Sequence, residues 1–222
     1  MIRCTRCLYP TTRPDSHFDA EGVCSGCRSF EQRKHINWDA RLAALEQLLD
    51  EAKQRNASHD VCVPVSGGKD STAQVLKLVD LGAKVLAVNS ATDMLTPLGR
   101  RNLDNLKRLC DVIEVTPNIE VRRKLVRLGL YRIGDPSYPE HCAIWSIPTR
   151  IAAQMRVPYV IWGEQPQREY SSPEGVEPAT NLDGFWVSQF GGMGGLRLGD
   201  LVGEDGLTDS DLSIFRFPSA EM

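Results

Sequence analysis

The alternation of short apolar runs with helical patterns constrains the fold of this chain more than any other feature. Apolar runs of strand length, rich in Val and Ile, occupy residues 60–66, 84–90, 111–117 and 157–163. Segments with a helical pattern lie between them, at 70–82, 98–110, 119–130 and 148–156, the last after a Pro-rich bend. Apolar strands that alternate with helices are typical of βαβ units, whose parallel sheet is buried on both faces. We therefore predict an α/β fold built on a doubly wound parallel sheet.

Two Cys-x-x-Cys pairs near the N-terminus are the second strong signal. "CTRC" contains Cys4 and Cys7, and "CSGC" contains Cys24 and Cys27. The 16 residues between the pairs fall within the spacing of zinc ribbons and knuckles, in which four thiolates surround one ion. Such a site leaves no coordination position open, so we predict a structural Zn²⁺, with an iron–sulfur cluster as the alternative. Prolines and glycines among residues 1–30 predict turns there rather than regular structure.

These patterns divide the chain into four parts. We predict a zinc module (1–36), a linker helix (37–58), an α/β domain (59–180) and a Gly-rich C-terminal extension (181–222). Asn37 or Asp39 can cap the linker helix. The extension is expected to consist of loops and turns, with one short helix after Thr208.

Charge and hydropathy narrow the classes of partner. The chain has 26 Lys and Arg against 29 Asp and Glu, a net charge of −3, which does not indicate a nucleic-acid-binding protein. A basic run at 122–132 has the pattern of a solvated helix face, which we favour over a phosphate-binding surface. The opening residues lack the pattern of a signal peptide, and no apolar run reaches the roughly 18 residues of a membrane span. We therefore expect a cytoplasmic protein without a membrane partner.

The motif "SGGKDS" at residues 66–71 follows the first apolar run and begins a helical pattern. It is not a Walker A loop, because Asp70 separates Lys69 from Ser71 and position 63 is Val where that loop needs Gly. A strand, two glycines and a helix N-terminus nevertheless form a general anion site. We predict that Ser66, Gly67, Gly68, Lys69 and Ser71 hold phosphate, and that Asp70 acts there through Mg²⁺.

"SGGKDS" after a buried strand resembles the signature of the PP-loop ATP pyrophosphatases. Members of that superfamily cleave ATP between the α- and β-phosphates and transfer AMP to a carbonyl oxygen, which a nitrogen or sulfur nucleophile then displaces. The resemblance implies that Lys69 and Asp70 are catalytic. By position it also implies that Asn89 and Ser90, at the end of the second strand, meet the adenosine.

Longer segments are similar to the N-acetyl sugar amidotransferase family, namely "CTRCLYPTTRPDSHFDAEGVCSGC", "LGRRNLDNL", "GDPSYP", "VIWGEQPQREY" and "GLTDSDLSIFRFPS". These enzymes replace an acetamido oxygen of a sugar with nitrogen, using ammonia from a separate glutaminase. Members of the family usually continue further, so the resemblance implies a C-terminally reduced one. It makes Gly163 and Glu164 candidates for the ATP site. The candidates for the small-molecule substrate are Asp135, His141, Gln165 and Glu169.

Cys142 makes replacement of the oxygen by sulfur an alternative to replacement by nitrogen. In "PEHCAIW" it stands beside His141 in the bend before a helix, where its pKa can be lowered. A buried, inert side chain is the other interpretation. As a nucleophile it would carry sulfur to a nucleobase, a nucleotide or, less in keeping with the charge, tRNA, with a sulfur-donor protein as partner. A non-catalytic nucleotide-binding subunit is a third interpretation, and a homodimer is compatible with each.

Overall fold

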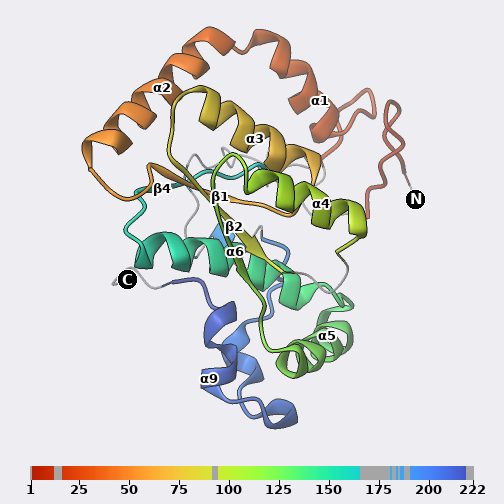
Figure 1. Ribbon diagram of the computed structural model, residues 1–222. Helices are drawn as coiled ribbons and strands as arrows, with labels where there is room; N and C mark the ends of the chain where they lie inside the picture. The colour runs from red at the N-terminus through yellow and green to blue at the C-terminus, as the bar shows by residue number, and fades with distance from the viewer. Residues whose placement is uncertain are drawn as a thin grey trace. The chain divides into compact units, whose positions relative to one another are not determined.

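The computed structural model describes residues 2–12, 17–91, 95–165, 181, 184, 186–187 and 191–218 (Figure 1). The chain forms two compact units, one of residues 1–43 and 164–182, the other of residues 44–163 and 183–222. Each is described by itself.

The larger unit contains a four-stranded sheet in which every pairing is parallel. The strands are β1 (Val61–Pro64), β2 (Val85–Ser90), β3 (Asp111–Val115) and β4 (Tyr159–Val160). Their order is β3-β2-β1-β4, with Val61 opposite Val85 on one side and Tyr159 on the other. The predicted α/β fold with a parallel sheet is confirmed.

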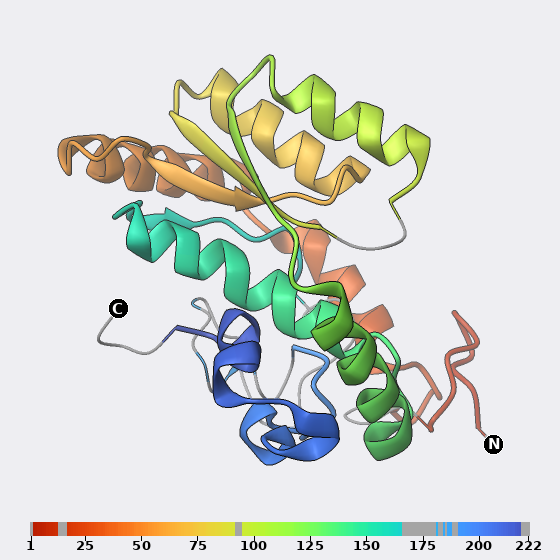
Figure 2. The same ribbon diagram turned by 60° about the horizontal axis from the view of Figure 1, so that its bottom comes forward.

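Helices cover both faces of this sheet (Figure 2). The helix α3 (Lys69–Asp80) lies on one face with α4 (Pro97–Leu106) and the later part of α2 (Trp38–Gln54). The other face is covered by α6 (Tyr138–Gln154), beside α5 (Ile119–Ile133). Leu49 of α2 and Val75 of α3 are buried against the strands, in a core formed mainly by Val and Leu. Leu49 lies in the predicted linker helix and Val75 in the helical pattern predicted at 70–82.

The start of α6 differs from the prediction. A bend was expected up to Pro148, but the helix begins at Tyr138 and continues through Pro148. A proline inside a helix costs about 3 kcal/mol because it removes a backbone hydrogen bond. That cost is offset here, since α6 buries nine of its residues, Tyr138 and Trp145 among them. Thr149 also donates a hydrogen bond to the Trp145 carbonyl oxygen (2.7 Å).

The C-terminal segment packs against α6. This segment, residues 191–218, contains the short helices η2 (Leu198–Leu201), η3 (Glu204–Gly206), α9 (Asp209–Leu212) and η4 (Ser213–Phe215). Thr208 caps α9, and its amide donates back to Asp211 (2.9 Å), so the short helix expected after Thr208 is confirmed. Ser146 of α6 donates to the carbonyl oxygen of Ile214 (2.8 Å). The segment is therefore a folded layer of the larger unit, in contrast to the loops expected for most of the extension.

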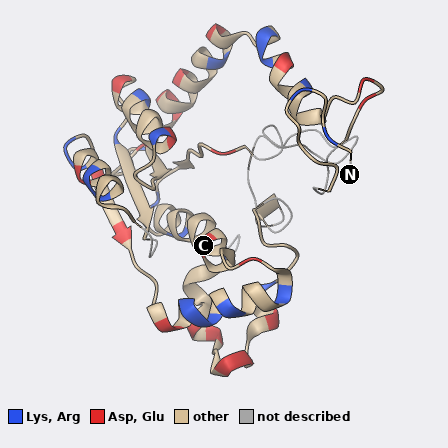
Figure 3. Cartoon of the chain, turned by 90° about the vertical axis from the view of Figure 1, so that its right-hand side faces the viewer, with Lys and Arg blue, Asp and Glu red and all other residues tan. Residues whose placement is uncertain are grey.

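Acidic residues of the same segment neutralise part of the basic run. Arg127 and Arg132 of α5 form ion pairs with Asp205 and Glu204. Figure 3 shows the Lys and Arg positions of α5 in blue beside the acidic positions of η3 in red. Arg127 and Arg132 therefore lie on a solvated, ion-paired helix face, as favoured by the sequence, whereas Arg122 at the start of the run is buried.

The smaller unit begins with two tight turns, each closed by one antiparallel bridge, Arg3 with Pro10 and Phe18 with Cys24. It continues into α1 (Ser25–Gln32) and η1 (Arg33–His35). The expectation of turns throughout residues 1–30 is wrong for α1, which begins inside the second cysteine pair. Asn37 caps α2 by accepting a hydrogen bond from the Ala40 amide (3.0 Å). No helix among the described residues is long and apolar enough to cross a membrane.

The contact between α5 and α6 leaves no room for a side chain at Gly129, which gives a first prediction. A Cβ there would lie 2.6 Å from both the Asp135 carbonyl oxygen and the Tyr138 Cβ. Gly129→Ala should destabilise the protein by about 1–3 kcal/mol through overpacking, although alanine favours a helix. The measurement is the free energy of unfolding in denaturant. Gly199→Ala is the control, because a Cβ there meets nothing within 4 Å, and should stay within about 0.5 kcal/mol of wild type. Equal stability of the two variants would contradict the packing described.

Candidate functional site

The candidate phosphate site is the turn that joins β1 to α3. Gly67 has φ +78°, which favours glycine, and a Cβ at this position would lie 2.6 Å from the Gly99 carbonyl oxygen. Asn102 of α4 donates a hydrogen bond to the Gly67 carbonyl oxygen (2.8 Å). The turn is thus held against α4 by contacts that only glycine permits.

Serine hydroxyls order the inside of this turn. The Gly68 amide donates to the Ser66 hydroxyl oxygen, and the Ser66 amide donates to that of Ser71, both at 3.4 Å. Gly68 is the N-cap residue of α3 and supplies no side chain to cap it. The first-turn amides of the helix, where the positive end of its dipole lies, are therefore open to an anion.

Lys69 and Asp70 stand at the start of α3 and face solvent. The Lys69 Nζ lies 2.7 and 2.8 Å from the two carboxylate oxygens of Asp70, and the side chains are 87% and 72% exposed. An ion pair between such exposed groups contributes at most about 1 kcal/mol. Both side chains can therefore leave this pairing for a bound ligand at little cost. Their catalytic roles stay predictions.

Asn89 and Ser90, predicted to meet adenosine, are buried at the end of β2. The Asn89 Nδ2 donates to the Val65 carbonyl oxygen (2.6 Å), which ties the end of β2 to the start of the turn. The Asn89 Oδ1 is buried without a hydrogen-bond partner among the described residues. An unpaired buried acceptor of this kind is costly, and a ligand that donates a hydrogen bond to it would remove the cost.

The candidates after β4 are separated by the boundary between the units. Gly163 belongs to the larger unit and lies beside α3, since a Cβ there would be 3.1 Å from the Gln74 Oε1. Glu164 and Gln165 belong to the smaller unit. Glu169 lies outside the described residues. Within the larger unit, Gly163 lies on the β1–α3 side of the sheet.

The strand order reverses at β1, so the carboxyl end of this strand is where an open α/β sheet is expected to bind a ligand. The chain moves from β1 to β2 to β3 on one side, then returns through α5 and α6 to place β4 on the other side of β1. Open α/β sheets bind ligands outside the carboxyl ends of their strands, where the strand order reverses. The turn at Ser66–Ser71 follows β1 at this point.

Asp135 and His141 lie together at the start of α6. The His141 Nδ1 is 3.4 Å from an Asp135 carboxylate oxygen and 3.0 Å from the Gly192 carbonyl oxygen. Both side chains are about one-third exposed. The sequence placed them on a substrate-side bend, whereas the structure has His141 in the first turn of a helix, in contact with the C-terminal segment.

An ion pair between a buried arginine and a half-buried glutamate lies close by in the fold and was not predicted. Arg122 of α5 is buried and donates to Glu140 of α6 (2.7 Å) and to the Ala91 carbonyl oxygen just after β2 (2.9 Å). In the sequence Arg122 is one of several arginines in a basic run. Only the crossing of α5 and α6 distinguishes it from the others.

The structure corrects the expectation of a lowered pKa at Cys142. Its side chain is 3% exposed, and burial raises the pKa of the thiol to about 12. The Sγ lies 3.4 Å from the Met193 Sδ of the C-terminal segment. Cys142 was expected in the bend before a helix, but α6 includes this position and the C-terminal segment covers it. The alternative interpretation, a buried and inert side chain, fits this environment.

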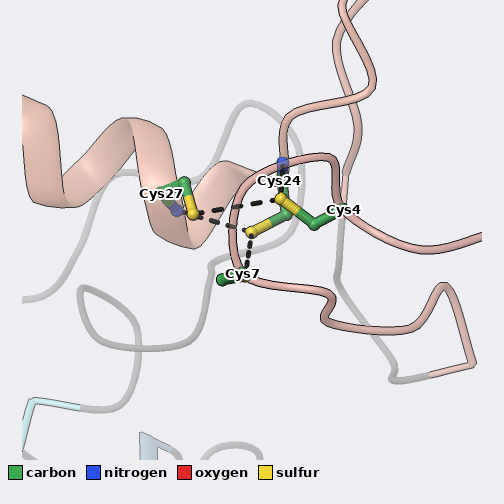
Figure 4. A group of neighbouring side chains, drawn as sticks. All are labelled: Cys4, Cys7, Cys24 and Cys27. Carbon is green, nitrogen blue, oxygen red and sulfur yellow. Dashed lines mark hydrogen bonds between the residues drawn. The ribbon is translucent and has the colours of Figure 1, made fainter.

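The four N-terminal cysteines converge on one point (Figure 4). The Sγ atoms of Cys4 and Cys27 are 3.9 Å apart, those of Cys7 and Cys24 are 3.6 Å apart, and all four lie within 4.8 Å of one another. A tetrahedral ion with Zn–S bonds of about 2.3 Å places its sulfurs about 3.8 Å apart. The cluster can therefore hold a single metal ion such as zinc. A polynuclear cluster spreads its ligand sulfurs over different irons and separates them further.

Backbone amides surround these sulfurs. The amides of Arg6 and Cys24 donate to the Cys4 Sγ (3.4 and 3.3 Å), and the Cys27 amide donates to the Cys24 Sγ (3.4 Å), which also caps α1. Burial raises the pKa of Cys4, but backbone hydrogen bonds from Cys7, Cys24 and Arg6 lower it to about 6. Burial and the neighbouring thiols raise the pKa of Cys27 to about 12. A bound cation favours the thiolate form of all four.

Comparison of the chain with protein-family models gives no match, and comparison with curated proteins gives none. The resemblances to PP-loop enzymes and to sugar amidotransferases therefore rest on the sequence segments alone.

The cysteine cluster predicts one metal ion per chain. Cobalt(II) should bind with the visible absorption of a tetrahedral thiolate complex, because four sulfurs converge at the required spacing. Cys27→Ser should lose this absorption. Cys110→Ser is the matched control and should keep it, since Cys110 lies in the other unit at the end of α4. Octahedral cobalt spectra, or equal binding by the two variants, would contradict the site.

The environment of Cys142 predicts slow alkylation. With a pKa near 12, the thiolate fraction at pH 8 is on the order of 10⁻⁴, and burial excludes the reagent as well. Iodoacetamide labelling followed by peptide mass spectrometry should show Cys142 among the slowest cysteines in the native protein. The same peptide in urea is the control and should react rapidly, because unfolding restores an ordinary thiol. Rapid labelling of native Cys142 would reopen its assignment as a nucleophile.

Proposed function

We propose that this chain is an ATP-dependent enzyme that adenylates a carbonyl oxygen of a small molecule, with pyrophosphate as the other product. The observation that carries the proposal is the turn at Gly67. An uncapped helix start follows a buried strand where the strand order reverses, and the turn's shape admits only glycine at Gly67. This arrangement suits the binding of phosphate groups.

Different residues of the turn are proposed to stabilise the pyrophosphate and to hold Mg²⁺. The open amides at the start of α3 and the Lys69 ammonium stabilise the negative charge that develops on the departing pyrophosphate. Asp70 is positioned to hold Mg²⁺, which neutralises phosphate charge when bound. Asn89, with its unpaired Oδ1, offers an acceptor to an amino or hydroxyl group of the nucleotide.

The proposed reaction has two displacement steps. The carbonyl oxygen of the acceptor attacks the α-phosphorus, and the bond to the β-phosphate oxygen breaks, so pyrophosphate leaves with the electron pair. Ammonia then attacks the activated carbon, the carbon–oxygen bond breaks and AMP leaves. A proton is lost from nitrogen. The net change is replacement of oxygen by nitrogen, as the resemblance to sugar amidotransferases implies, and a glutaminase is the proposed source of ammonia.

We favour nitrogen over sulfur because of Cys142. A sulfur carrier must be reachable and ionisable, and this thiol is buried with a raised pKa. The cysteine cluster does not supply the carrier, because all four of its thiols are directed to one point (Figure 4). We assign that cluster to a structural zinc ion, which leaves no open coordination position for chemistry.

Binding of ATP to the turn can be tested without the acceptor. Gly67→Ala should weaken ATP binding at least tenfold, because the new methyl group meets the Gly99 carbonyl and distorts the cradle. Isothermal titration with ATP and Mg²⁺ measures the effect. Pyrophosphate should compete with ATP in wild type, since the turn is proposed to hold the two terminal phosphates.

Gly82→Ala is a matched control for the strain of the substitution. Gly82 has nearly the same φ (+75°) and flanks the other end of α3, but a Cβ there meets nothing within 4 Å. It should lose stability without losing ATP affinity. Lys69→Ala should abolish competition by pyrophosphate, whereas Lys77→Ala, on the last turn of the same helix, should not. Unchanged ATP binding in Gly67→Ala and Lys69→Ala would remove the basis of the proposal.

A further inference from the structure

The smaller unit contains a pocket that the proposed adenylation does not use. Its volume is about 640 Å³, within the range of pockets that hold small molecules. The lining residues come mainly from the end of α1, from η1 and from the first turn of α2 (Figure 1). The side chains that matter for recognition are Gln32, Arg33, His35, Trp38, Arg41 and Gln165.

The lining is cationic. Its described lining residues include two arginines and a histidine, and none of these described residues is Asp or Glu. Arg33 and Arg41 form no ion pair with any described residue, unlike Arg6 and Arg28 of the same unit, which are paired with Glu31. Guanidinium groups without a carboxylate partner are suited to bidentate binding of phosphate.

An aromatic surface lies beside these charges. Trp38 is 62% exposed, although a tryptophan side chain is usually largely buried. The Arg33 guanidinium lies 5.3 Å from the centre of the Phe30 ring, which restrains it next to the pocket. Flat rings of a ligand stack on tryptophan and on guanidinium planes.

We propose that this pocket binds a nucleoside phosphate, with the base against Trp38 and the phosphate between Arg33 and Arg41. Gln32 and Gln165 provide amide groups that can hydrogen-bond the edge of a base. The ligand is a free nucleotide or a small molecule attached to one, because the volume matches a small molecule. The pocket belongs to the smaller unit and the turn at Gly67 to the larger one, and this inference does not depend on the adenylation proposal.

The indole N–H signal of Trp38 in a nitrogen–proton correlation spectrum provides the test. The chain has four tryptophans, and the signal missing in Trp38→Phe identifies Trp38. Titration of the wild type with AMP, CMP, GMP and UMP should shift that signal saturably for at least one nucleotide. Arg33→Gln and Arg41→Gln should each raise the dissociation constant at least tenfold.

Lys34→Gln is the matched control, because Lys34 is the neighbour of Arg33 in η1 and does not line the pocket. It should change the affinity less than twofold, and Lys69→Ala should leave the Trp38 shift unchanged.

Loss of affinity at Lys69 alone would assign the nucleotide to the turn and overturn this site. The proposal is also overturned if no nucleotide shifts Trp38, if Lys34→Gln acts as strongly as Arg41→Gln, or if inorganic phosphate gives the same shift. Affinity that rises with the length of an oligoribonucleotide would indicate a nucleic-acid surface instead. The cobalt spectrum checks that each variant keeps its metal site.

Discussion

The close contact of Gly67 with α4 is the constraint on which the larger unit depends. A parallel strand must end abruptly for the next helix to cross back over the sheet, and here the chain does so in four residues between β1 and α3. The positive φ of Gly67 and the approach of the Gly99 carbonyl to 2.6 Å from a hypothetical Cβ leave no alternative to glycine. The same geometry exposes the amides of the helix start. The packing against α4 and the proposed binding of an anion therefore both require glycine at this position.

The position of the C-terminal segment and the burial of Cys142 depend on α6. This helix lies against β1 and β2 on one side and carries the C-terminal segment on the other. Hydrogen bonds from Ser146 and Trp145 to backbone carbonyls of that segment hold it in place. Trp145 also packs on Trp162 and Trp186, with ring centres 4.4 and 5.4 Å away. Because the segment covers α6, Cys142 loses the solvent that a nucleophilic thiol needs. The proposed preference for nitrogen over sulfur chemistry thus depends on how this segment packs against α6.

The smaller unit has too few apolar residues to form a large core. Cys4, Val23 and Cys24 are its only tightly clustered buried residues in the part of the chain that the structure describes, with Tyr9 and Phe18 packed around them. Most of its order comes instead from amide–sulfur hydrogen bonds and from Arg28, which pairs with Asp19, Glu21 and Glu31. A metal ion at the four sulfurs would supply the missing free energy, as in other domains of this size.

The sequence by itself determined the parallel sheet, the helices of its crossovers and the cysteine cluster that can hold a metal ion. Each is a local pattern: apolar runs of strand length, a helical repeat near 3.6 residues, and two Cys-x-x-Cys pairs. It also located the turn at Ser66–Ser71, because two glycines between an apolar run and a helical pattern predict a tight turn. Only the tertiary structure decided where α6 begins, since burial of Tyr138 and Cys142 outweighs the prolines that predict a bend. It alone selected Arg122 from a run of similar arginines and assigned Cys142 to the interior. These outcomes depend on contacts between residues far apart in the chain, and no local pattern records which side chains will meet.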